Sequence, residues 1–211
     1  MQYRTLGKTG LSVSVIGIGA LQMGNCTLEE TKTILKEAHE GGINYIDTAR
    51  AYNESETRLG QALKELGLRK DFILSSKVIK RDFETCLKNL QTDYLDIFFI
   101  HDVSTAANWN AIQKNGILDY ALELKRQGRI RHLGISTHDC QIGEQIIKTG
   151  LFEVAMLAYN PTNLEVEDTL FPLCQSYDMG IVIMKPYGGG ILTEARSAQM
   201  GFSITAEEAL R

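Results

Sequence analysis

The segment Tyr94-Leu95-Asp96-Ile97-Phe98-Phe99-Ile100-His101 decides the fold of this 211-residue chain. Its centre is an almost continuous run of large apolar residues, which is typical of a strand buried on both faces of a parallel sheet. Comparable runs recur along the sequence, and amphipathic segments with one apolar helical face separate them. We therefore predict seven buried strands, at residues 15–19, 45–46, 72–74, 94–100, 130–135, 154–158 and 181–184.

Strict alternation of strands and helices implies a parallel sheet covered by helices, either an open doubly wound sheet or a closed barrel. Polar residues follow the carboxyl ends of several different strands, whereas a doubly wound sheet gathers its ligand groups at one switch point. Residues 3–13 also read as a hairpin before the first strand. We predict an α/β fold of the TIM type, a (β/α)8 barrel with an N-terminal β-hairpin. The polar residues at the strand ends are Asp47, Lys77, His101, Ser136, Asn160 and Lys185.

Residues 1–211 are expected to form a single barrel domain that is incomplete at its C-terminus. The sequence encodes about seven of the eight strand-helix units that such a barrel contains. Thr205-Ala206-Glu207-Glu208 has the pattern of a capping box, which begins a helix, but only Ala209-Leu210-Arg211 follows it. We therefore expect the eighth strand and its helix to be missing from this chain.

Composition excludes several classes of partner. A formal charge of −4 gives no general electrostatic reason to bind nucleic acid or an anionic membrane. The N-terminus lacks the apolar core of a signal peptide, and no stretch approaches the roughly 20 apolar residues of a membrane span. The four cysteines form no CxxC pair, so we expect them to serve as small apolar residues in a protein of a reducing compartment. The expected location is the cytoplasm.

Four residues at neighbouring strand ends carry the candidate chemistry. Asp47 ends the second predicted strand, and Tyr52 lies in the loop that follows it. Lys77 follows the third predicted strand and His101 follows the fourth. In a barrel, the carboxyl ends of the strands meet at one face, where active sites of this fold lie. We therefore expect all four side chains to converge.

This set resembles the catalytic tetrad of the aldo-keto reductase family, an Asp, a Tyr five residues later, a Lys and a His on successive strand ends. The resemblance spans nearly the whole chain and is closest to a bacterial subgroup that often carries a C-terminal iron–sulfur module. It implies an NAD(P)H-dependent oxidoreductase that reduces a small aldehyde or ketone. Besides the tetrad, the segments that carry it are Tyr3–Leu11, Gly134-Ile135-Ser136, Tyr159-Asn160 and Lys185-Pro186-Tyr187-Gly188-Gly189-Gly190.

The tetrad residues suit this reaction, because hydride transfer to a carbonyl carbon leaves an alkoxide that must be protonated or screened. Tyr52 is the candidate general acid, and a neighbouring Lys77 ammonium would stabilise its phenolate. Asp47 would orient Lys77 and balance its charge. His101 would donate a hydrogen bond to the carbonyl oxygen and fix the substrate.

The resemblance also implies a cofactor site, with NADP as the family default and NAD as the other possibility. Its nicotinamide carboxamide would be held by a Ser-Asn pair after the fifth strand and a Gln on the sixth. This sequence keeps Ser136 but has Thr137 and Met156 at the other two positions. Tyr187 and the glycines Gly188, Gly189 and Gly190 would border the pyrophosphate, where glycine permits close backbone approach.

No metal site is predicted. His138 and Asp139 follow the fifth strand, but a metal site needs three or four ligands and the sequence offers two there. Two other functions stay open. Lys77 or Lys185 could form a Schiff base in an aldolase-type barrel, although pairing with Asp47 would keep Lys77 protonated. A barrel that senses a cofactor or binds a partner without catalysis is the other alternative.

Overall fold

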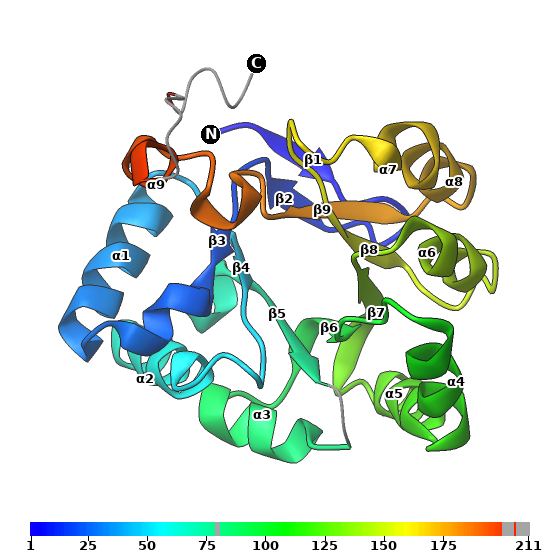
Figure 1. The fold of residues 1–211 in the computed structure, drawn as a ribbon. Coiled ribbons are helices and arrows are strands. Elements are labelled where there is room, and N and C mark those ends of the chain that lie inside the picture. Colours follow the sequence, from blue (N-terminus) through cyan, green and yellow to red (C-terminus); the bar gives the residue numbers. More distant parts are fainter. Residues whose placement is uncertain (79–80, 200–204, 206–211) are drawn as a thin grey trace.

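The computed structural model describes residues 1–78, 81–199 and 205. Seven parallel strands form one curved sheet in the order β3-β4-β5-β6-β7-β8-β9, and helices cover its outer side (Figure 1). A separate two-stranded antiparallel sheet, β1-β2, precedes it. This arrangement confirms the predicted α/β fold of the TIM type with an N-terminal hairpin. Of the predicted capping box at the end of the chain, residues 206–208 lie outside the described residues.

The strands and helices alternate as predicted. The strands are β1 Tyr3–Thr5, β2 Ser12–Ser14, β3 Ile18–Gly19, β4 Tyr45–Asp47, β5 Ile73–Val78, β6 Leu95–Ile100, β7 Ile130–Thr137, β8 Val154–Ala158 and β9 Gly180–Met184. The helices are α1 Leu28–Glu40, α2 Ser55–Leu66, α3 Phe83–Leu90, α4 Ala106–Lys114, α5 Ile117–Arg126, α6 Cys140–Ile147, α7 Glu165–Asp168, α8 Leu170–Ser176 and α9 Glu194–Gln199. The 3-10 helices are η1 Ala20–Asn25, η2 Arg69–Asp71 and η3 Gly188–Gly190.

The strand boundaries differ most from the prediction in the third and the first predicted strand. The third predicted strand, residues 72–74, is β5 and continues to Val78, so that Lys77 lies inside the strand and not after it. The polar residues of β5 do not fit the apolar pattern of a buried strand. They can lie in it because each has a hydrogen-bond partner. The first predicted strand shortens to Ile18–Gly19, because Val15 and Ile16 are exposed side chains of the segment that leaves the hairpin.

Apolar side chains fill both sides of the sheet, which explains the nearly continuous apolar run of β6. Ile97 and Phe99 face the barrel interior, where they pack with Tyr45, Val154 and Met156. The alternate residues Phe98 and Ile100 pack against the helices instead. Successive side chains of a strand point to opposite faces, so a strand covered on both faces needs apolar residues at every position.

The N-terminal hairpin packs against the start of β9. Gly7 has a left-handed φ of +49° and forms a bridge with Met179. A Cβ atom on Gly7 would lie 2.3 Å from the backbone nitrogen of Gly180, and a Cβ atom on Gly180 would lie 2.5 Å from Cγ of Leu6. The two glycines therefore permit a close approach of backbone to backbone.

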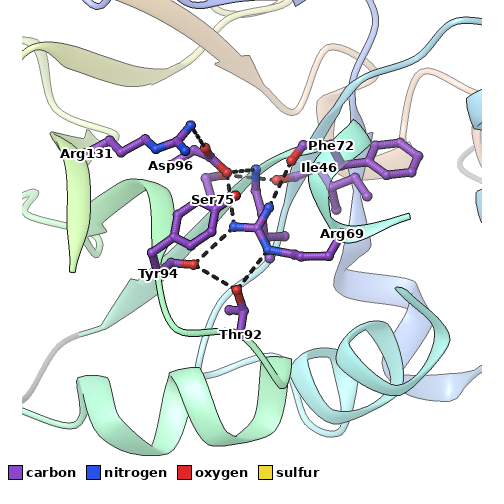
Figure 2. Close-up of polar contacts among 9 residues, drawn as sticks. Ile46, Arg69, Phe72, Ser75, Thr92, Tyr94, Asp96 and Arg131 are labelled. Carbon is purple, nitrogen blue, oxygen red and sulfur yellow. Dashed lines mark hydrogen bonds and ion pairs between the residues drawn. The ribbon is translucent and has the colours of Figure 1, made fainter. Parts of the chain in front are cut away.

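A buried ionic network ties the amino ends of three strands together (Figure 2). Asp96 of β6 is 2% exposed; its Oδ2 accepts hydrogen bonds from the Leu74 backbone nitrogen at 2.9 Å and from Arg69 Nη2 at 3.1 Å. Its Oδ1 accepts from Arg131 Nη1 at 2.9 Å. The guanidinium groups of Arg69 and Arg131 lie 4.3 Å and 4.6 Å from the centre of the Tyr94 ring. The network holds the strands in place at the end of the sheet opposite to the candidate site.

Candidate active site

Asp47 and Lys77 form an ion pair at the carboxyl ends of β4 and β5. The parallel register pairs Asp47 with Ser75, which places Lys77 two residues further along on the same face. Lys77 is 1% exposed; Nζ pairs with Asp47 Oδ2 and donates to the Thr48 backbone oxygen at 2.8 Å. An ammonium group buried this deeply requires a compensating charge and hydrogen-bond acceptors, and Asp47 and Thr48 supply them.

Tyr52 lies close to both Lys77 and His101. Its ring centre is 4.9 Å from Lys77 Nζ and 5.9 Å from the centre of the His101 ring, which it meets at 83°. Backbone hydrogen bonds hold the loop, with the Tyr52 nitrogen donating to Ala49 and the Ser55 nitrogen donating to Tyr52. The structure therefore brings all four predicted tetrad residues together.

His101 is a neutral imidazole at physiological pH. Burial, and then the nearby positive charge of Lys77, lower its pKa from 6.5 to about 4. Its Nδ1 atom is buried and has no hydrogen-bond partner among the residues that the structure describes. A neutral imidazole carries one N–H donor and one acceptor nitrogen, so His101 can donate a single hydrogen bond to a carbonyl oxygen beside Tyr52.

The predicted carboxamide-binding residues lie on two different faces of the sheet. Ser136 and Met156 are paired in the register of β7 and β8, and Met156 packs in the barrel interior. Ser136 Oγ accepts a hydrogen bond from the Asp102 backbone nitrogen at 2.8 Å and can still donate its own proton.

Thr137 faces the other side of the strand from Ser136. Its hydroxyl donates to the Asp139 backbone oxygen at 3.2 Å, and its methyl group lies 3.2 Å from the position a Cβ atom on Gly143 of α6 would occupy. The reason is the alternation of the strand, because the residue after an inward-facing serine must face outward.

The loop after β9 follows a path that suits glycine. Gly188, Gly189 and Gly190 have φ angles of +58°, +69° and +96°, and Tyr187 precedes them as a partly exposed side chain. Asn160 anchors the start of this loop by donating to the Lys185 backbone oxygen at 3.1 Å. Backbone without Cβ atoms can approach a phosphate closely.

His138 and Asp139 serve separate structural purposes. His138 Nδ1 lies 3.0 Å from Asp102 Oδ1, whereas Asp139 caps α6 by accepting from the Ile142 nitrogen at 2.8 Å. Within residues 1–78, 81–199 and 205, no three His, Cys, Asp or Glu side chains are arranged to hold a metal ion.

The sequence analysis missed one polar residue of the site. Ser75 Oγ donates to Asp47 Oδ1 at 2.7 Å, whereas Lys77 pairs with the other carboxylate oxygen of Asp47. The signal that could have found it is the period of two in a strand, which places Ser75 on the same face as Lys77.

The model of the aldo/keto reductase family matches residues 15–208. This match confirms the resemblance to that family. The chain belongs to the aldo/keto reductase family. This aldo/keto reductase is 28% identical to the NADH-specific methylglyoxal reductase of Escherichia coli, over 90% of this chain and 66% of that protein. It is also 29% identical to a probable voltage-gated potassium channel subunit beta of Arabidopsis thaliana, over 92% of this chain and 66% of that protein.

A solved structure supports the assignment of the fold. The aldo-keto reductase from Klebsiella pneumoniae in complex with NADPH matches with a TM-score of 0.76 and 25% identity, over 90% of this chain and 69% of that chain. The chain spans about two thirds of the length of the curated relatives it matches. In the part of the chain that the structure describes, none of the helices has the length and apolar character needed to cross a membrane.

Proposed function

We propose that this aldo/keto reductase uses NAD(P)H to reduce an aldehyde or ketone to an alcohol, with Tyr52 as the general acid. The observation that carries the proposal is the position of the Lys77 ammonium, which is buried between Asp47 and the ring of Tyr52. A phenolate that forms beside a buried ammonium is stabilised by the positive charge of that ammonium.

The reduced nicotinamide, when bound, supplies the hydride that adds to the carbonyl carbon. Tyr52 gives its hydroxyl proton to the carbonyl oxygen, and Lys77 balances the negative charge left on the phenolate. Asp47 holds Lys77 in place through their ion pair. His101 donates its one N–H to the same carbonyl oxygen and thereby orients the substrate.

The residues around the tetrad fit a nicotinamide cofactor. Ser136 keeps a hydroxyl proton that can bind a carboxamide oxygen, whereas Met156 is buried in the barrel interior. Gly188–Gly190, with Tyr187 beside them, suit the pyrophosphate. We propose NADP as the cofactor, because one structural neighbour is a complex with NADPH. NAD is the alternative, because one relative is named NADH-specific.

Turnover of a small reactive carbonyl tests the proposal. We expect the protein to consume NADPH or NADH when a panel of aldehydes and ketones is added, as measured by the loss of nicotinamide absorbance. The alcohol product is identified by mass spectrometry. Saturable cofactor binding without turnover of any panel member would contradict the proposal.

That contradicting outcome would favour a barrel that senses the cofactor or binds a partner, as the likeness to channel beta subunits suggests. A Schiff-base aldolase is the other alternative, and borohydride trapping of a substrate adduct would reveal it. The ion pair with Asp47 speaks against that reaction, because a protonated Lys77 is a poor nucleophile.

A further inference from the structure

A short chain of hydroxyl groups runs from the barrel interior to the tetrad. The Tyr45 hydroxyl lies 2.9 Å from Ser75 Oγ, and Ser75 Oγ donates to Asp47 Oδ1 at 2.7 Å. Asp47 Oδ2 then pairs with Lys77, whose ammonium lies beside Tyr52. Tyr45 is 6% exposed and Ser75 is completely buried, so both hydroxyl groups are shielded from bulk water.

The direction of the hydrogen bonds in this chain depends on the charge of Asp47. An ionised carboxylate only accepts hydrogen bonds, so Ser75 must give it its single proton. The other acceptor near Ser75 Oγ, the Ile46 backbone oxygen, is more distant at 3.3 Å. Because the Ser75 proton is committed to Asp47, Tyr45 must donate to Ser75. Both hydroxyl dipoles therefore point at the carboxylate and stabilise its ionised form.

We propose that Ser75 and Tyr45 are positioning residues, which keep Asp47 ionised and aimed at Lys77 so that the ammonium stays charged beside Tyr52. The inference rests on the proposed function, because it assigns these residues a part in the chemistry of the tetrad.

The surroundings of Asp47 show why such support is needed. Burial raises the pKa of Asp47 above its ordinary value, and the Lys77 charge together with the hydrogen bonds from Lys77 and Ser75 oppose that rise. Burial, and then the charge of Asp47, raise the pKa of Tyr45 well above its ordinary value, so Tyr45 stays a donor. Among the described residues, Tyr52 and the neutral His101 are further titratable groups close to Lys77.

The titration of the Asp47 carboxyl group tests the proposal directly. Carbon-detected NMR of labelled aspartate, with the Asp47 signal assigned by Asp47→Asn, gives its midpoint in the unmodified protein and in variants. Ser75→Ala should raise the midpoint by about one pH unit, because the hydrogen bond that favours the charged form is lost. Tyr45→Phe keeps the ring and should raise it by a smaller amount. The acid limb of the kcat profile should move upward in the same order.

Two further variants provide the controls. Ser76 is an equally buried serine of β5, but it faces the helices and donates to Glu56 Oε1 at 2.8 Å. Ser76→Ala therefore removes a buried hydroxyl without touching the chain to Asp47, and the Asp47 midpoint should stay in place. Ser75→Thr keeps a hydroxyl group, so its Asp47 midpoint should stay close to that of the unmodified protein. An unchanged midpoint in Ser75→Ala, or an equal shift in Ser76→Ala, would overturn the inference.

The NMR readout separates this inference from the proposed function. A shifted Asp47 midpoint in a protein that reduces no carbonyl would support the hydroxyl chain and contradict the reductase assignment. Normal turnover with an unshifted Asp47 midpoint in both Ser75→Ala and Tyr45→Phe would support the reductase assignment and contradict the role of the hydroxyl chain.

Discussion

Replacing Tyr52 with phenylalanine should lower kcat by about 10²- to 10⁴-fold, the usual loss when a general acid is removed. The substitution deletes only the hydroxyl group, so the ring that lies 4.9 Å from Lys77 Nζ and packs edge-on against His101 is kept. The affinity for NADPH or NADH should therefore change little, and the loss should fall on kcat. Steady-state kinetics and cofactor titration measure the two effects separately.

The control for this experiment is Tyr3→Phe. Tyr3 also loses a hydroxyl that makes a hydrogen bond, to the Gly42 backbone oxygen at 2.7 Å, but it lies in the N-terminal hairpin. The kcat of Tyr3→Phe should stay within about twofold of the kcat of the unmodified protein, since surface substitutions of this kind have small effects. A Tyr52→Phe protein that retains more than about half of the original kcat would contradict the assignment of the general acid.

Replacing Asp96 with alanine should lower the free energy of unfolding by about 3–5 kcal/mol. The change leaves the buried backbone N–H of Leu74 without an acceptor and leaves Arg69, which is 15% exposed, without its counter-charge. The side chain of Arg131 is 54% exposed and is rehydrated at smaller cost. Because domains are typically stable by about 5–15 kcal/mol, this single change removes a large share of the stability. Denaturant unfolding followed by circular dichroism measures it.

An exposed ion pair provides the comparison. Glu123 pairs with Arg126 at 2.7 Å on the surface of α5, and Glu123→Ala should shift the unfolding midpoint far less than Asp96→Ala, because solvent screens an exposed pair. If Asp96→Ala and Glu123→Ala shift the unfolding midpoint equally, water replaces the Asp96 carboxylate and the network of Figure 2 does not hold the strands together.

The strands could be predicted from the sequence because a sheet covered on both faces leaves a simple pattern. In β6 the residues facing the interior and those facing the helices are all large and apolar, apart from Asp96. The pattern failed where polar residues are buried with partners. Ser75, Ser76 and Lys77 of β5 do not continue the apolar run of residues 72–74, but their hydrogen bonds to Asp47, Glu56 and Thr48 allow them to lie in the strand.

The tetrad could be predicted because topology alone places the carboxyl ends of parallel strands at one face. Finer placement depends on which face of the strand each residue occupies. Thr137 follows Ser136 by one residue and therefore packs toward α6, which a comparison of residue types could not show. Burial and the low pKa of His101 depend on side chains from several strands and could not be predicted from local sequence.

A double-mutant cycle on Tyr52 and Lys77 tests most directly whether these two residues act as one proton-donating unit. The measured quantity is kcat for Tyr52→Phe, Lys77→Met and the combined variant, with the reduced nicotinamide and a carbonyl that the unmodified protein turns over. Residues that act as a unit show losses that do not multiply. We expect the combined variant to be about as slow as the slower single variant. A combined loss equal to the product of the two single losses would contradict the account.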